Sequence, residues 1–239
     1  MTKHPFHLVT HSPYPLATAF SLLLFIVSLI LSWNLFSPWY LLPSAFLVFY
    51  FCFEWASNIS IEATYLGCHT SAVRKGHIIG FRLFIVSEVF FFLSWFWAYF
   101  HFSLSPAVEI GSMWPPLGIK TSSPFTLPLL NTFLLLTSGA SVTWASSSLS
   151  SAIYFSADTA LCLTLTLGLA FICFQAAEYY FSSFTISDSC FGSSFFILTG
   201  FHGLHVCIGL MLLVLRLVRL KIGTITCSRH TSFLVSSWY

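Results

Sequence analysis

Two acidic side chains interrupt otherwise apolar stretches of this sequence. Glu88 stands alone in the run FIVSEVFFFLSWFWAYF. Counting ~1.5 Å per residue from Gly76 places it about 18 Å along a helix, and a charge at that depth of a membrane costs about 2.5–3.5 kcal/mol. We therefore expect Glu88 to be protonated and to face protein, either as a proton-relay or conformational carboxyl or as a neutral hydrogen-bonding group between helices. Glu178 in QAAEYY is expected to bond a helix terminus or a neighbouring loop.

A pair of histidines has the spacing of a possible ligand set. His202 and His205 lie three residues apart in TGFHGLHV and therefore share one helical face. Such a pair can bind a metal or haem, but the sequence nearby offers no third or fourth ligand. The neighbouring glycines at positions 200, 203 and 209 favour close helix packing. We interpret the two imidazoles as interhelical hydrogen-bonding groups and expect no metal in this chain.

Polar and basic residues gather at the ends of apolar runs. Basic groups at this level of a membrane attract anionic lipid headgroups, or they serve as the general positive charge that orients a membrane protein. The residues are Glu62, His69, Arg74 and Lys75 between the second and third runs, and Arg216, Arg219 and Lys221 at the end of the sixth.

The composition indicates an integral membrane protein. Charged residues make up 7% of the 239 residues, whereas soluble domains carry about 25%. Apolar residues make up 57%, and the mean hydropathy is +0.87. A net charge of +2 from scattered residues forms no basic stripe, which excludes nucleic-acid binding. The seven cysteines form no CxxC motif, so we expect neither a disulfide framework nor a structural zinc site.

The apolar runs define the elements that must position these groups. A spanning helix needs about 20 mainly apolar residues, and hydrocarbon admits helices rather than open sheets. The sequence therefore predicts an all-α integral membrane protein with six transmembrane helices. The runs are 16–33, 39–53, 83–100, 125–145, 159–177 and 189–215.

Orientation follows from the distribution of Lys and Arg. With six crossings, one side collects nearly all of these residues, and the opposite side has only Lys120. The N- and C-termini are therefore expected on the cytoplasmic side of a bacterial membrane or the matrix side of a mitochondrial one. No signal peptide precedes the first run, which suggests synthesis on the side of insertion. The basic side holds Lys3, Arg74, Lys75, Arg216, Arg219, Lys221 and Arg229.

Several long motifs resemble one family. They are FTISDSCFGSSFFILTGFHGLHV (184–206), LFIVSEVFFFLSWFWAYFHFSLSP (83–106), MWPPLGI (113–119), PLLNTFLLLTSGASVTWA (128–145) and QAAEYY (175–180). In this order they resemble cytochrome c oxidase subunit III of the mitochondrially encoded type, over nearly the whole chain.

The resemblance implies a fold and a role. It implies a V-shaped arrangement of two helices plus four, divided into a two-helix arm (1–57), a connecting loop (58–75) and a four-helix bundle (76–239). It implies a non-redox subunit of the mitochondrial inner membrane that supports the catalytic subunit, aids proton uptake and oxygen access, and holds phospholipids such as cardiolipin or phosphatidylglycerol in its cleft. Haem and copper would belong to the partner subunits I and II, and accessory oxidase subunits would complete the complex.

Individual residues carry over from the resemblance. Glu88 matches the family's intramembrane carboxyl that reacts with carbodiimide. Glu62, Thr64 and His69 match positions that contact phospholipid headgroups. Arg219 matches a basic residue near a bound cardiolipin, with Lys221 one place before the next basic residue of the family pattern.

The C-terminal residues depart from the family pattern. In the family, a Trp-Tyr pair precedes a seventh spanning helix, whereas this sequence ends at Trp238 and Tyr239. We expect a separate polypeptide to supply the seventh helix. The rival expectation is that the helix is lost and that lipid or an accessory subunit fills its place.

Two other functions compete with this interpretation. A proton-coupled secondary transporter could use Glu88 as its coupling carboxyl, but such proteins show inverted repeats and broken helices, which this sequence does not. A catalytic membrane oxidase in its own right would need several paired His ligands, and only His202 and His205 lie well inside a run.

Overall fold

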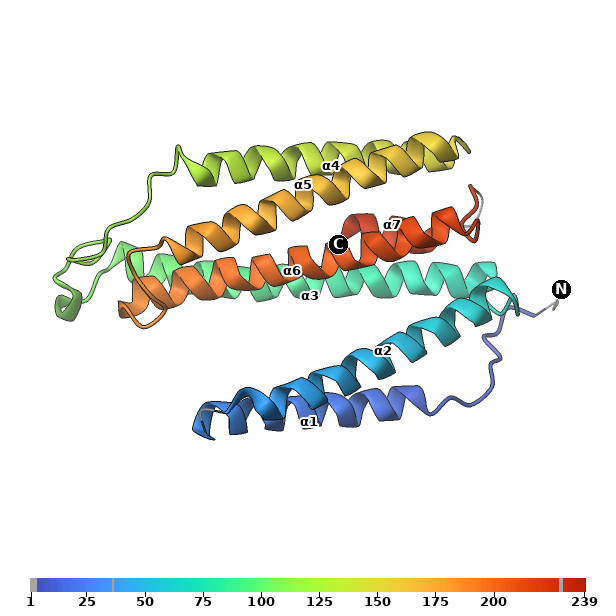
Figure 1. Ribbon diagram of the computed structural model, residues 1–239, viewed down its shortest axis with the longest axis horizontal. Coiled ribbons are helices and arrows are strands. Elements are labelled where there is room, and N and C mark those ends of the chain that lie inside the picture. The colour runs from blue at the N-terminus through green and yellow to red at the C-terminus, as the bar shows by residue number, and fades with distance from the viewer. Residues whose placement is uncertain (1–3, 36, 228–229) are drawn as a thin grey trace. The chain divides into compact units, whose positions relative to one another are not determined.

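The computed structural model describes residues 4–35, 37–227 and 230–239, so Lys3 and Arg229 of the predicted basic side lie outside it. Within the described residues, every regular element is helical (Figure 1). Two 3-10 turns, Pro38–Tyr40 (η1) and Val108–Ile110 (η2), lie in the connections. The helices are α1 (Tyr14–Leu35), α2 (Leu41–Thr64), α3 (Ser71–Leu104), α4 (Leu127–Ser150), α5 (Tyr154–Tyr180), α6 (Ser189–Lys221) and α7 (Thr231–Trp238).

Five of the described helices, namely α1, α2 with η1, α3, α5 and α6, are long and apolar enough to cross a membrane. The fourth predicted span is also a helix, α4, with 24 residues. It is absent from that group of five, and its sequence is interrupted by many Ser and Thr residues. The prediction of an all-α membrane protein is confirmed. The short helix α7 follows the last predicted span, where the hydropathy pattern gave no element.

The chain divides into two compact units, residues 1–77 and 78–239, with the division inside α3. Each unit is described by itself. The predicted three-part division and the V-shaped arrangement stay predictions.

In the first unit, α1 and α2 pack through small polar residues. The buried residues of α1 are Thr18, Ser21, Ser28 and Ser32, while its Leu, Ile and Phe side chains are largely exposed. The hydroxyls donate to carbonyls of their own helix, as Thr18 does to Tyr14 at 2.7 Å. Small residues allow close helix contact, and lipid tails solvate the outward apolar side chains, so this inverted pattern is typical of membrane helices.

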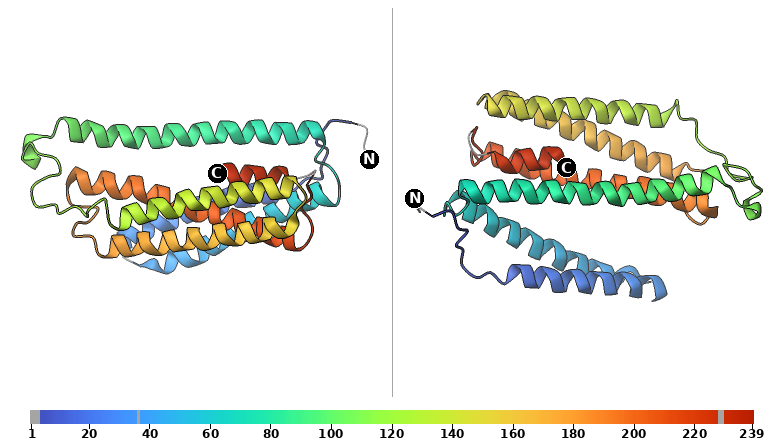
Figure 2. Two further views of the ribbon diagram at one scale, coloured as in Figure 1. Left: turned by 90° about the horizontal axis from the view of Figure 1, so that it is seen from above. Right: turned by 180° about the vertical axis from the view of Figure 1, so that it is seen from behind.

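In the second unit, α4 and α5 are neighbouring helices (Figure 2). Ala145 and Ala160 are fully buried between the helices, and the Ser141 and Thr164 hydroxyls meet at 2.7 Å. Helix α7 adds Phe233, which is 1% exposed, to the core that these helices form with the end of α6. This packing holds α6, which carries the predicted His pair.

Candidate functional site

Glu88 of α3 and His205 of α6 meet directly. The distance between Glu88 Oε2 and His205 Nε2 is 2.6 Å. The other ring nitrogen, Nδ1, lies 2.7 Å from the carbonyl oxygen of Phe201, one turn earlier in α6. The structure thus brings together two residues that the sequence analysis treated separately, because 117 positions lie between them and no local pattern links them.

The partners of His205 fix where its protons are. A carbonyl oxygen only accepts, so Nδ1 carries a hydrogen. Nε2 then either accepts a hydrogen bond from a protonated Glu88 or, as part of an imidazolium, donates one to the carboxylate. In both arrangements the pair has no net charge, which suits its position in two apolar helices. The protonated Glu88 expected from the sequence corresponds to the first arrangement and stays a prediction.

The same contacts test whether His205 suits a haem or a metal. Both of its ring nitrogens already have hydrogen-bond partners, so neither nitrogen is directed at an open site. Its ring is also stacked by Tyr239, with 5.7 Å between the ring centroids. His202 instead meets the ring of Phe171 in α5 edge-on, with 6.0 Å between the ring centroids. The two imidazoles therefore do not form a ligand pair.

Glu178 lies at the end of α5 beside the loop that precedes α4. The hydroxyl of Ser122 in that loop donates to Glu178 Oε1 at 3.4 Å, and Ser183 donates to the carbonyl of Lys120 at 2.7 Å. These bonds tie the long loop to the α5–α6 connection.

The predicted basic residues at the end of α6 have partners within the second unit. Arg219 Nε donates to the hydroxyl of Thr224 at 3.4 Å. Lys221 Nζ lies 3.9 Å from Asp158 Oδ1 of α5, in an ion pair whose lysine is 61% exposed. Exposed pairs of this kind contribute about 0–1 kcal/mol, so Lys221 remains able to meet an external anion.

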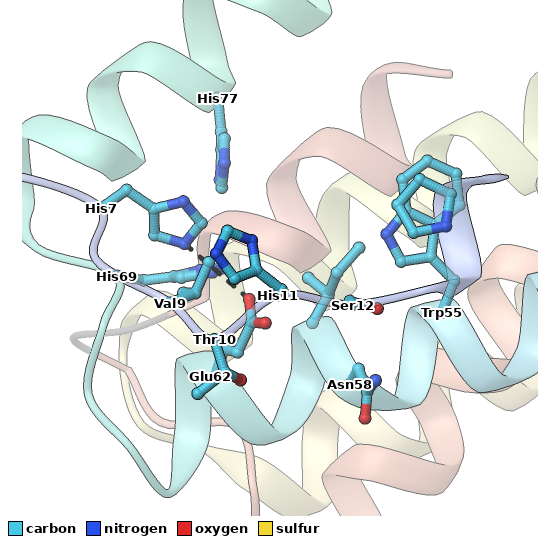
Figure 3. Close-up of a pocket in the computed structure, with 12 residues that line it drawn as sticks. His7, Val9, Thr10, His11, Ser12, Trp55, Asn58, Glu62, His69 and His77 are labelled. Atoms are coloured by element: carbon cyan, nitrogen blue, oxygen red, sulfur yellow. Dashed lines mark ion pairs between the residues drawn. The ribbon is translucent and has the colours of Figure 1, made fainter.

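The first unit contains a cavity of ≈ 440 Å³ at the end of α2 (Figure 3). Its wall combines the extended segment before α1 with α2 and the start of α3. Among the predicted lipid contacts, Glu62 and His69 line it, while Thr64 is the last residue of α2. The lining also includes His7, His11, Trp55, Asn58 and His77.

Local backbone geometry positions these side chains. Gly67 has a φ of 66° in the turn after α2, a conformation that glycine adopts without steric strain. The Cys68 N–H then donates to the Glu62 carbonyl at 3.0 Å, which brings His69 back toward the helix end. The Thr70 hydroxyl donates to the carbonyl of Pro5 at 3.0 Å and anchors the N-terminal segment over this turn.

Two imidazoles, those of His7 and His69, lie beside the Glu62 carboxylate, and the imidazole of His77 lies next to them. His7 Nε2 lies 3.8 Å from Glu62 Oε2, and the ring of His69 lies 5.3 Å from that of His7 and 5.0 Å from that of His77. Burial lowers the pKa of His69, and electrostatic interactions with the neighbouring His77 and His7 side chains lower it further. The sequence analysis found Glu62 and His69 but missed His7 and His77. The polar, histidine-bearing N-terminus was the available signal, and its position depends on a contact 65 residues away.

The comparisons with known proteins identify the family. Its profile, described as "Cytochrome c oxidase subunit III", matches residues 4–239. This chain belongs to the cytochrome c oxidase subunit III family. The assignment agrees with the resemblance found in the sequence motifs, places the chain in an oxidoreductase complex as a multi-pass membrane protein, and argues against the transporter alternative.

Three similar relatives are all named "Cytochrome c oxidase subunit 3". The protein of Rhipicephalus sanguineus is 44% identical over 239 residues, covering 100% of this chain and 93% of the relative. That of Ornithorhynchus anatinus is 47% identical and covers 99% and 90%. That of Emericella nidulans is 48% identical and covers 97% and 87%.

Proposed function

We propose that the chain is a non-redox core subunit of a mitochondrial cytochrome c oxidase. The family match over residues 4–239 carries this proposal. In this role it supports subunits I and II, which hold the haem and copper, and it aids proton uptake and oxygen access while electrons pass from cytochrome c to oxygen. The hydrogen bonds at both nitrogens of His205 support a role without a redox centre in this chain.

The membrane side follows from the charged residues. Arg74 and Lys75 lie near the start of α3, while Arg219 and Lys221 lie in the last turn of α6. Under the positive-inside rule, these groups support an inner-membrane orientation with both termini on the matrix side.

Purification through a tag on this chain tests the role. The expected result is that subunits I and II, accessory subunits and the haem absorbance of the oxidase copurify with it. The isolated chain, separated in denaturing detergent and returned to mild detergent with added haem, is expected to show no haem spectrum. A stable haem band from the isolated chain would instead favour an oxidase in its own right.

We further propose that the cavity of the first unit receives a phospholipid headgroup. Glu62 offers carboxylate oxygens to an ammonium or hydroxyl, and the amide of Asn58 offers both donors and acceptors. Trp55 has an apolar ring with a polar N–H, which suits the boundary between headgroup and acyl chain. In the second unit, Arg219 and Lys221 offer positive charge to an anionic lipid such as cardiolipin.

Replacing Arg219 tests the anionic-lipid part of this proposal. A basic group near a membrane surface contributes about 1 kcal/mol of attraction to anionic lipid, which is about a fivefold change in retention. Arg219→Ala is therefore expected to reduce the cardiolipin retained per haem by about fivefold under a detergent wash, measured by mass spectrometry. Lys120→Ala, on the opposite predicted side, is the matched control. Equal cardiolipin loss in both variants, or no loss in Arg219→Ala, would contradict the assignment.

A further inference from the structure

His7, Glu62 and His69 form a compact set of metal-ligand atoms. One ligand atom from each residue lies within 4.8 Å of the others. Two imidazoles and one carboxylate are a donor set that binds Zn²⁺ in proteins. The three come from different parts of the first unit: the segment before α1, the last turns of α2, and the α2–α3 turn (Figure 3).

We propose that His7, Glu62 and His69 bind a divalent transition-metal ion, Zn²⁺ foremost, at a site separate from the redox metals of the oxidase. The sequence analysis considered metal binding only for His202 and His205 and therefore expected none. The site uses protein atoms alone, so it does not depend on the lipid proposal.

To hold an ion, the ligand atoms must close from separations of up to 4.8 Å. Zn²⁺ binds nitrogen and oxygen at about 2.0–2.2 Å, so two ligand atoms of a tetrahedral site lie about 3.3 Å apart. His7 Nε2 and Glu62 Oε2 are already 3.8 Å apart. The His7 side chain is 37% exposed and lies on a segment without regular structure, so it can move the remaining distance.

The electrostatics of the cluster also favour a cation. The three side chains together offer two imidazole nitrogens and one carboxylate oxygen, the donors that Zn²⁺ binds. An ion beside Glu62 gains the attraction of the carboxylate. His77 stands next to the set, with its ring 5.0 Å from His69 and 6.4 Å from His7. His77 is not one of the three proposed ligands. Three protein ligands leave the fourth position of a tetrahedral ion for water or for a phosphate oxygen in the same cavity.

Metal binding would have a structural consequence. His7 belongs to the segment before α1, which is held to the α2–α3 turn by the Thr70–Pro5 hydrogen bond. Coordination by His7, Glu62 and His69 would add a second and stronger attachment. Zn²⁺ is therefore expected to slow proteolysis of the N-terminal segment.

Zinc titration of the intact oxidase tests the proposal. The complex is washed with EDTA and titrated with radioactive Zn²⁺, and bound zinc is counted per haem. The wild type is expected to take up one more Zn²⁺ than His7→Gln at low micromolar zinc, with affinity falling at least roughly tenfold in the variant. His11→Gln is the matched control, because His11 lines the same cavity but is outside the triad. It should bind zinc and protect its N-terminal segment as the wild type does.

Any one of three results would contradict the proposed metal site. Equal zinc uptake by the wild type and His7→Gln would do so, as would an equal loss in His11→Gln. Glu62→Gln provides a second variant that preserves side-chain size, and unchanged affinity there would also count against the site. Phospholipid phosphorus is measured in the same samples. If bound zinc per haem decreases only in samples that have also lost phospholipid, the zinc was bound by lipid phosphates. If bound zinc decreases in His7→Gln while phospholipid is unchanged, the result supports the triad.

Discussion

Gly192→Ala is expected to prevent most of the oxidase from accumulating in assembled form. Gly192 lies in the first turn of α6, where an added Cβ would overlap the carbonyl oxygen of Thr185. That carbonyl belongs to a tight connection in which Asp188 Oδ2 accepts hydrogen bonds from the Thr185 N–H at 2.6 Å and the Thr185 hydroxyl at 3.1 Å. A backbone atom cannot rotate away as a side chain can, so the start of α6 must shift. Overpacking of this kind costs about 1–3 kcal/mol or more.

Two other glycines provide graded controls. An alanine at Gly168 would meet the Leu210 side chain, which can change rotamer, rather than backbone, so a smaller loss is expected. An alanine at Gly200 would meet nothing within 4 Å. Haem content of the membranes and the unfolding temperature of the purified complex should be highest in Gly200→Ala, lower in Gly168→Ala and lowest in Gly192→Ala. If Gly192→Ala were as stable as Gly200→Ala, the contact with Thr185 would not constrain this connection.

The long helices could be predicted because hydropathy determines which segments can cross a membrane. The residues at which the helices end could not be predicted in this way. The apolar run of the third span begins at Leu83 and the depth of Glu88 was counted from Gly76, whereas α3 begins at Ser71 and includes Arg74 and Lys75. Helical hydrogen bonds form equally well in a polar segment at the membrane surface, so the loss of apolar residues does not mark the helix end. Helix α7 was not predicted, for a different reason. Its eight residues are too few to give a clear periodicity, and its position depends on the packing of Phe233.

The functional groups were predictable as individual residues but not as sets. A carboxyl in an apolar run is conspicuous, so Glu88 was found, and so was the His202–His205 spacing. The spacing, however, suggested that the two histidines act together, whereas His205 pairs with Glu88 and His202 packs against Phe171. Contacts between distant helices depend on how the helices rotate and pack. A single sequence contains no direct signal of that rotation.

The Glu88–His205 hydrogen bond supports a prediction that separates packing from proton transfer. In Glu88→Gln, the amide N–H can donate to His205 Nε2, because Nδ1 keeps its hydrogen for the Phe201 carbonyl. We expect this variant to assemble and to keep most of its oxygen consumption. Glu88→Ala leaves Nε2 without this partner and is expected to cost about 1–3 kcal/mol, seen as a lower unfolding temperature of the complex.

A double-mutant cycle with His205→Ala completes the test. If the stabilising effect of Glu88 acts through His205, the stability losses of Glu88→Ala and His205→Ala will add to more than the loss in the double variant. Oxygen consumption and proton release are measured on the same preparations. A nearly complete loss of oxygen consumption in Glu88→Gln, with assembly and unfolding temperature unchanged, would contradict a packing role. Gln preserves the hydrogen bond but cannot exchange the proton that Glu88 and His205 share, so that result would place this proton in the turnover of the oxidase.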